Sequence, residues 1–336
     1  MVWLICLALL LPTTQEPPMP PIGVIDFYGL RNVSEQQVRA ALQIKEGDSL
    51  SDKPKEARRR LEALPGVAET HFNLVCCEAG KATLYVGIRE KGTHSSLSFR
   101  TAPQGKVRLP SALTQVGEDF EKALTTAMLK GNAGEDDSQG HALMSDPSAR
   151  AIQESFIAFA ARELKIIRDV LHHSEDAEQR ALAAQVIAYT NDKQAIISDL
   201  VEAMRDPAGG VRNNSMRALA VMAGSASQKT KSPLRIPARP FIALLNSIDW
   251  TDRNKSSLAL LSLTEQRDPA VLAALRQSAV PALIEMARWK VAGHAYAPFF
   301  LLGRVANLPE KETQEAWEHN NRTAFIEAAA KKLQTN

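Results

Sequence analysis

The side chains best suited to chemistry in this chain of 336 residues are two adjacent histidines followed by acidic residues. His172 and His173 precede Glu175, Asp176 and Glu178. Imidazoles and carboxylates bind Zn²⁺, but two ligands on one helix need an i, i+4 spacing and a third ligand farther along the chain. Adjacent histidines at a helix end instead cap carbonyl groups and suit the negative end of the helix dipole. We therefore predict no metal site here.

The other reactive side chains do not form a recognisable site either. Cys76 and Cys77 are adjacent, so in a strand they point to opposite faces, and we interpret them as small apolar strand residues. Glu135, Asp136 and Asp137 lack the alternating spacing of a calcium loop, which favours a disordered acidic loop. No nucleophile-elbow, phosphate-loop, dinucleotide-binding or zinc-protease motif occurs. The sequence thus predicts no catalytic residue, no cofactor and no enzyme.

The overall composition excludes one class of partner. Forty Lys and Arg residues against 38 Asp and Glu residues leave a net charge of +2, whereas a nucleic-acid-binding domain usually carries a strong basic excess. The chain is 45% hydrophobic, which is enough for packed cores, and its length favours about two domains. We predict a protein or an extended peptide as partner, and neither nucleic acid nor a small-molecule substrate.

The first 21 residues are predicted to direct the chain out of the cytoplasm. An unbroken apolar run, 2–11, is followed by a Pro-rich stretch that ends at Pro21. Such a run is too short to span a bilayer, which takes about 20 residues, but it suits the apolar part of a signal peptide. No basic residue precedes it, and no small-x-small cleavage site follows. Residues 1–21 therefore predict a periplasmic or cell-envelope protein, with the segment cleaved or kept as a tether; a cytosolic scaffold that keeps it is the alternative.

Residues 22–91 have the pattern of a small α/β module. The predicted elements are a strand over 22–28, a helix after Ser34, a helix over about 51–64, and strands over 67–77 and 82–90. Ser34 and Gln37 form a capping box, which indicates a helix start, and Pro65-Gly66 ends the second helix. The expected order is β-α-α-β-β.

Several residues of this module match one known domain family. They are Phe27-Tyr28-Gly29-Leu30, Ser34 to Val38 with Leu42, Gly47-Asp48, Leu61-x-x-Leu64-Pro65-Gly66-Val67, and Leu84-x-Val86-x-Ile88-x-Glu90. In this combination the module resembles a POTRA domain, the polypeptide-transport-associated unit of the bacterial periplasm. Transport proteins usually carry several copies, and this chain carries one. The resemblance implies docking of polypeptides or envelope partners, because an open sheet edge accepts an extended peptide; a folded spacer is the alternative.

Residues 92–154 are predicted to be a linker that contains one helix. The stretch from Gly92 to Pro110 contains Thr, Ser, Gly and two Pro residues, which indicates irregular structure. Apolar residues then recur at helical spacing over 111–130, namely Leu113, Val116, Phe120, Leu124 and Met128. We therefore expect an amphipathic helix over 111–130, followed by the acidic loop.

Residues 155–333 are predicted to form helical hairpins. The predicted helical segments cover 157–171, 177–189, 193–204, 211–223, 237–245, 253–263, 269–289, 293–305 and 311–333. They make about four hairpins, and at least three stacked units are needed to bury a continuous core.

One pattern recurs within this region at a spacing of 32 positions. Ser174 is followed six positions later by Arg180, and Asp206 is followed six positions later by Arg212. Each arginine is followed by a helical stretch that contains Ala-Leu-Ala. A period in the low thirties with two helices in each unit is typical of a helical solenoid.

This pattern resembles HEAT repeats of the short type that also occurs in HEAT-like lyases. The matching residues are Asp206-Pro207, Val211-Arg212 and Ala218-Leu219; Ser174, Arg180 and Val186-Ile187; and, more loosely, Asp249, Asp252, Arg253 and Leu258-Ala259-Leu260. In that family the carboxylate caps a helix and the arginine reaches the turn of a neighbouring repeat. The resemblance implies these structural roles for Asp206, Arg212 and Arg180, in an all-α right-handed solenoid that follows the α+β module. Binding of an anionic ligand by the arginines is the alternative.

A basic insertion interrupts the repeats at 224–239. It carries Lys229, Lys231, Arg235 and Arg239 and no acidic residue. Insertions of this kind lie on one face of a solenoid, often the binding face. We therefore nominate these four residues as a possible partner-binding site; a mobile surface loop is the alternative.

Taken together, these features predict a non-enzymatic protein–protein interaction scaffold of the bacterial cell envelope. The module would dock a polypeptide, and the helices would present a concave binding surface. The alternative is a HEAT-like lyase or a protein that handles a chromophore or other small ligand. An acidic or aromatic cluster in the concave groove would favour that alternative, and the sequence shows none.

Overall fold

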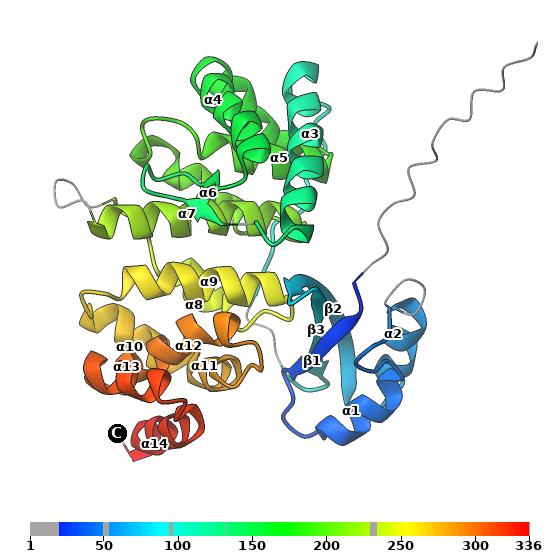
Figure 1. Cartoon of the computed structure of the whole chain (residues 1–336), viewed down its shortest axis with the longest axis vertical. Helices are drawn as coiled ribbons and strands as arrows, with labels where there is room; N and C mark the ends of the chain where they lie inside the picture. Colours follow the sequence, from blue (N-terminus) through cyan, green and yellow to red (C-terminus); the bar gives the residue numbers. More distant parts are fainter. Residues whose placement is uncertain (1–19, 50–53, 94–96, 133, 229–233, 336) are drawn as a thin grey trace, which may run out of the picture.

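The computed structural model describes residues 20–335 apart from 50–53, 94–96, 133 and 229–233 (Figure 1). A small α/β module, residues 22–91, lies beside a mostly helical region that begins at residue 111. The prediction of an α+β module followed by helices is therefore confirmed. All but the last two residues of the predicted targeting segment 1–21 lie outside the described residues.

A three-stranded sheet forms the centre of the module. Its strands are β1 (Ile22–Tyr28), β2 (Val67–Glu78) and β3 (Lys81–Glu90), in the order β1-β3-β2. β1 is parallel to β3, and β2 is antiparallel to it. β3 is thus the central strand, and both of its neighbours are edge strands.

Two helices, α1 (Glu35–Leu42) and α2 (Pro54–Glu62), cover one face of the sheet. Ser34 and Gln37 form the expected capping box at the start of α1. The core between the helices and the sheet contains Ile22, Ile25, Val38, Leu42, Ala57, Leu61, Leu84 and Val86, among others. Burial of these side chains accounts for the helical and alternating patterns in the sequence.

The other face of the sheet packs against the helical region. Tyr28 and Tyr85 point away from α1 and α2 and belong to the core of the helices. The ring of Tyr85 stacks on Trp250, with 4.8 Å between the centroids, and its hydroxyl lies 2.7 Å from His294 Nδ1. Burial lowers the pKa of His294 to about 4, so the imidazole is neutral in this contact at pH 7. Tyr28 contacts Trp289 edge to face. These aromatic contacts fix the module to the helices.

The segment predicted to be a linker lies across turns of the helical region. We call residues 97–109 the strap. The N–H of Arg100 donates to Arg205 O at 2.7 Å, and the N–H of Gly105 donates to His173 O at 2.8 Å. The N–H of Glu175 donates back to Gly105 O at 2.7 Å. The strap is therefore held to two successive turns, and only its lack of periodicity made it look like a free linker.

The helix predicted over 111–130 is present as α3 (Ser111–Leu129). The acidic loop after it is ordered where it is described, contrary to the prediction. Its residues form β4 (Glu135–Asp136), which pairs with β5 (Leu143–Met144). Glu135 forms an ion pair with Arg217, and Asp136 forms one with Arg150. These pairs with distant arginines could not be read from the local composition.

The remaining helices continue the chain as follows: α4 (Pro147–His173), α5 (Ala177–Ile187), η1 (Gln194–Ile196), α6 (Ile197–Ala203), α7 (Gly209–Gln228), α8 (Arg239–Leu244), α9 (Trp250–Leu263), α10 (Pro269–Ser278), α11 (Val280–Ala287), α12 (Ala292–Val305), α13 (Glu310–Glu318) and α14 (Arg322–Thr335). Two predicted helical segments are broken. α10 and α11 replace one helix over 269–289, because a new helix begins at Val280 with Pro281 in its first turn. α13 and α14 replace one helix over 311–333, where Asn320 adopts a φ of 55°.

Four helices pack against one another in chain order: α5 on α7, α7 on α9, and α9 on α12. Each follows a short turn after the preceding helix, α4, α6, α8 or α11. The helices run one below another in Figure 1, and the module lies against the ends of the lower ones. In the described residues, no single helix is long and apolar enough to cross a membrane. Only α10 and α11 taken together have that length and composition, and they meet at 83°.

Candidate functional site

Three arginines connect successive turns of the helical region, and we call them the arginine ladder. They are Arg180 on α5, Arg212 on α7 and Arg253 on α9. Each donates to the carbonyl oxygen of the residue six positions earlier, namely Ser174 at 2.8 Å, Asp206 at 3.0 Å and Ser247 at 2.5 Å. Each arginine also binds a carboxylate that belongs to the next unit of the chain.

The first contact of the ladder is a buried bidentate ion pair. Arg180 Nε and Nη2 donate to the two oxygens of Asp206 at 2.9 and 2.8 Å. Arg180 is 1% exposed, and Asp206 is fully buried. Asp206 also accepts the N–H of Ala208 at 2.9 Å, at the turn before α7. The pair joins the turn before α5 to the turn before α7 with the geometry that suits a guanidinium and a carboxylate.

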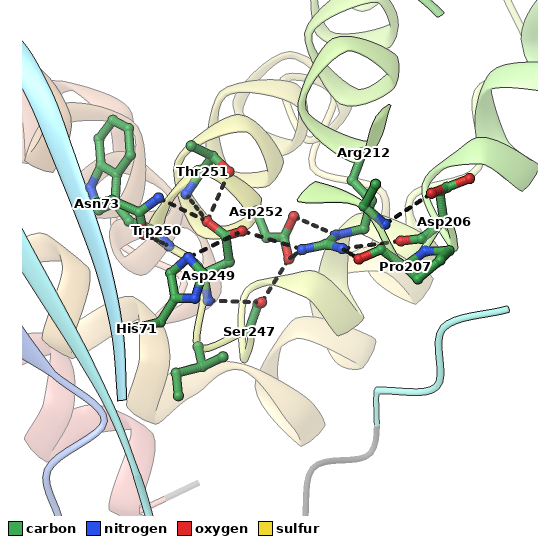
Figure 2. Close-up of polar contacts among 12 residues, drawn as sticks. His71, Asn73, Asp206, Pro207, Arg212, Ser247, Asp249, Trp250, Thr251 and Asp252 are labelled. Atoms are coloured by element: carbon green, nitrogen blue, oxygen red, sulfur yellow. Dashed lines mark hydrogen bonds and ion pairs between the residues drawn. The ribbon is translucent and has the colours of Figure 1, made fainter. Parts of the chain in front are cut away.

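The second contact of the ladder is shown in Figure 2. Arg212 Nε donates to Asp252 Oδ1 at 2.9 Å, and its Nη2 donates to Asp252 Oδ2 at 2.9 Å. Its Nη2 also lies 3.3 Å from Asp249 Oδ2. Arg253 Nη1 then donates to Glu285 of α11 at 2.6 Å. Most guanidinium nitrogens of the ladder bind protein oxygens, which leaves little capacity for an anionic ligand.

Asp249, which contacts Arg212 of the ladder, also contacts the sheet of the module. Asn73 of β2 donates from Nδ2 to Asp249 Oδ1 at 3.3 Å and accepts the N–H of Trp250 at 3.1 Å (Figure 2). His71, two residues earlier on β2, lies 3.8 Å from Asp249 Oδ2. One face of β2 is thus fixed by polar contacts to the turn before α9.

The strap covers the ladder from outside. Arg100 Nη2 donates to Asp206 Oδ2 at 2.8 Å, which gives that carboxylate a second guanidinium. The ring of Phe99 lies over the guanidinium of Arg212, with 4.2 Å between Arg212 Cζ and the centroid of the ring. These contacts hold the strap in place without regular secondary structure.

The outer edge of β1 is partly closed by the helical region. Along a strand, the backbone groups of successive residues point alternately to opposite sides. The carbonyl of Ile25 accepts Lys290 Nζ at 2.6 Å, and the N–H of Gly29 donates to Glu285 Oε1 at 2.6 Å, so residues 25, 27 and 29 direct these groups away from β3. A groove of about 650 Å³ lies along this edge, between β1, α11 and α14. Side chains of α11 and the turn after it therefore occupy places that an added strand would need.

The outer edge of β2 is open after Thr70. The N–H of Thr70 donates to Glu62 of α2 at 3.2 Å, so even-numbered residues here direct their backbone groups away from β3. Phe72 and Leu74 follow in the same orientation. Within the described part of the chain, no hydrogen-bond partner is present for their outward N–H and C=O groups. These four groups form an unpaired strand edge, the kind of surface that pairs with another chain.

The predicted site residues are divided between two places. Asp206, Arg212 and Arg180 lie together in the ladder, as described above. Lys229 and Lys231 lie outside the described residues. Arg235 and Arg239 are exposed, and the N–H of Arg235 donates to Gln194 Oε1 at 3.0 Å. α7 reaches Gln228, five residues beyond the predicted end, so the insertion is shorter than expected.

The histidines and Cys76 differ from their predicted roles. His172 Nε2 lies 2.9 Å from Asp199, and His173 Nδ1 lies 2.8 Å from Asp169, so both rings contact carboxylates and not the helix-end carbonyls. No group of three or more metal-binding side chains occurs in the described ranges. Cys76 is in a disulfide bond, so its interpretation as a simple apolar strand residue is wrong.

Sequence reasoning missed the strap, did not say which sheet edge is open, and matched Arg253 to the repeat only loosely, without assigning it a role. Ser247 precedes Arg253 by six positions, the same interval that separates Ser174 from Arg180, so this serine could have assigned Arg253 the same role as Arg180. No protein-family model matches this chain, and a search of curated proteins finds no match.

Proposed function

We propose that this protein is a non-enzymatic interaction scaffold of the bacterial cell envelope. Its POTRA-like module docks an extended polypeptide, which adds as a fourth strand beside β2. The observation that carries this proposal is the pair of unpaired backbone positions, Phe72 and Leu74, on an edge strand whose other face is fixed to the helical region. The cell-envelope location rests on the apolar run over 2–11.

Strand addition at this edge follows from backbone chemistry. Phe72 and Leu74 together offer two N–H donors and two C=O acceptors in one line, and an extended peptide presents the complementary groups at the same repeat. A net gain of 0.5–1.5 kcal/mol for each hydrogen bond gives about 2–6 kcal/mol for four bonds. That is too little for tight binding alone, so side-chain contacts must set the specificity of the interaction.

The rigidity of β2 supports binding at this edge. The side chains of Asn73 and His71 point to the face of the sheet that packs against the helical region, where they contact Asp249, as Figure 2 shows. The strand therefore does not have to become ordered when a peptide binds, which lowers the entropic cost. β2 also lies against α3, so a peptide on this edge would pass near the helical region.

The helical region is proposed to be a right-handed HEAT-like solenoid with a concave binding surface. The packing order α5, α7, α9, α12 supports this, as do three arginines with one spacing and one kind of contact. Two neighbouring helices of this series each expose a large apolar side chain, Leu258 on α9 and Tyr296 on α12. Such side chains suit contact with a protein partner.

The alternative of a chromophore-handling or lyase-type protein gains no support from the aromatic cluster. Tyr85, Trp250 and Trp289 do gather, but they pack on one another between the module and the helices. Each of these side chains is at most 5% exposed. Their packing accounts for the attachment of the module and offers no face to a ligand.

Leu74→Pro is expected to weaken partner binding while the module stays folded. Proline removes an N–H that points away from β3, and edge strands accept proline at such positions. Leu74→Ala is the matched control, because it shortens the side chain and keeps the N–H. After crosslinking in the native host and mass spectrometry, the alanine variant should keep the partners of the wild type. The proline variant should recover them at a level about tenfold lower, equivalent to about 1.4 kcal/mol.

Asn73→Pro tests the orientation on which this proposal depends. The N–H of Asn73 points toward β3, so its loss should unfold the module, as judged by circular dichroism. Equal partner recovery from the proline and alanine variants at position 74 would contradict strand addition. If the Asn73→Pro variant is folded and as stable as the Leu74→Pro variant, the assignment of the open edge is contradicted.

A further inference from the structure

A second surface, whose lining contains no residue of β2, has the features of a built binding site. A cavity of about 350 Å³ lies between the strap, the turn after α6 and the start of α8. We call it the strap pocket, and its lining includes Leu97, Phe99, Met204, Arg205, Arg239 and Leu244. Its volume is at the lower end of the range of about 300–1,000 Å³ for ligand pockets.

The wall of the strap pocket is apolar and held in place. Phe99 is 38% exposed, which is unusual for a large aromatic side chain. One face of its ring is covered by the guanidinium of Arg212. The next residue, Arg100, is fixed by its N–H to Arg205 O at 2.7 Å and by its guanidinium to Asp206 at 2.8 Å. Phe99 is therefore an exposed aromatic anchor that is already ordered before a partner binds.

The rim of the strap pocket is cationic. Arg205 and Arg239 are both exposed. In the part of the chain that the structure describes, neither guanidinium forms an ion pair, and no Asp or Glu lines the pocket. Two free guanidiniums beside an apolar floor favour a ligand that combines a carboxylate with an apolar group.

We propose that the strap pocket binds an acidic peptide, which inserts one large apolar side chain against Phe99 and places carboxylates on Arg205 and Arg239. An aromatic wall flanked by arginines is the usual composition of an interface hot spot. A cavity of about 350 Å³ has room for a large side chain of a peptide, whereas a membrane surface would call for a broad apolar face. The site is independent of strand addition at β2, and it gives the predicted residue Arg239 a partner of defined chemistry.

The probe is a random peptide library displayed on phage, selected on the full chain. The enriched peptides should combine an aromatic or leucine residue with neighbouring Asp or Glu. Their affinity should fall at least about tenfold for the double variant Arg205→Glu/Arg239→Glu and for Phe99→Ala, and it should weaken as salt is added. Arg31→Glu/Arg288→Glu is the matched control, because it reverses two exposed arginines elsewhere and should leave the affinity unchanged.

Two further results distinguish peptide binding in the strap pocket from binding at β2 and from a loss of folding. Leu74→Pro should not change the affinity of the selected peptides, since that residue belongs to the edge of β2. Circular dichroism should show that the double variant is folded, because both arginines are exposed. The proposal is overturned if no peptide is enriched, if the enriched peptides lack acidic residues, or if the double variant binds them equally well. Binding of phosphatidylglycerol vesicles that depends on Arg205 and Arg239, without peptide enrichment, would assign the pocket to lipid and equally overturn it.

Discussion

Replacement of Asp206 by alanine is expected to lower the free energy of unfolding by about 3–5 kcal/mol, because it leaves a buried arginine without its counter-charge. Asp206 is fully buried and binds Arg180 with both oxygens, and it also binds Arg100. Arg180 is itself 1% exposed, so its guanidinium has no route to water. Denaturant unfolding followed by circular dichroism measures the change.

The same carboxylate gives stability a defined dependence on pH. Burial alone would raise the pKa of Asp206, but hydrogen bonds from Arg180 and Arg100 outweigh it, and the pKa is lowered. The unfolded value is about 3.9, so the contribution of Asp206 is complete above that pH and is lost as the pH falls through the lower folded value. Asp206→Asn should therefore be less stable at pH 7, and its stability should fall less between pH 5 and pH 2 than that of the wild type.

Glu175→Gln is the control for both measurements. Glu175 lies in the turn before α5 and contacts Arg108 at 3.4 Å, but both side chains are exposed. An exposed pair contributes about 0–1 kcal/mol, so this change should be small. A loss of less than about 1 kcal/mol for Asp206→Ala would show that the ladder does not hold the turns together.

Trp250→Ala is expected to separate the unfolding of the module from that of the helices. Trp250 is 5% exposed and stacks on Tyr85 with an interplanar angle of 19°. Truncation of a buried tryptophan costs about 3–5 kcal/mol, and here the loss falls on the contact between the two parts. Calorimetry should show one transition for the wild type and two for the variant.

Trp317→Ala is the matched control, because it truncates a tryptophan within the helical region. Trp317 packs against Tyr296, Phe299 and Phe300 and has no aromatic contact with the described residues of the module. Its truncation should lower the transition temperature and leave a single transition. Two transitions in the wild type would show that the module is attached loosely, and the fixed orientation of β2 would then be wrong.

Local patterns were sufficient to predict most elements of the fold. The strand over 22–28, the capping box at Ser34 and the helix from Ser111 depend on side chains near in sequence, and all three are present. The break at Pro281 was also readable in principle, since proline favours the first turn of a helix. The strap was not predictable, because its order comes from hydrogen bonds to distant turns such as that of Arg205.

The candidate site was predicted only in outline. A sheet with an open edge was expected, but the sequence does not say which edge is open. That choice depends on Lys290 and Glu285, which lie more than 250 positions from Ile25 and Gly29, the residues that they bind. The strap pocket likewise joins Phe99 to Arg239, which are far apart in the chain. Tertiary contacts of this kind determine where the site forms, and no local pattern in the sequence reveals them.

The exchange of individual amide protons at β2 tests strand addition most directly. In the free chain, NMR should show fast exchange for the N–H groups of Phe72 and Leu74 and slow exchange for that of Asn73, because only Asn73 points toward β3. With the crosslinked partner purified and added, exchange at Phe72 and Leu74 should slow at least about tenfold, and exchange at Phe27 on β1 should not change. Protection of Phe72 and Leu74 in the free chain, or binding of the partner without any change at these two residues, would contradict the proposed function.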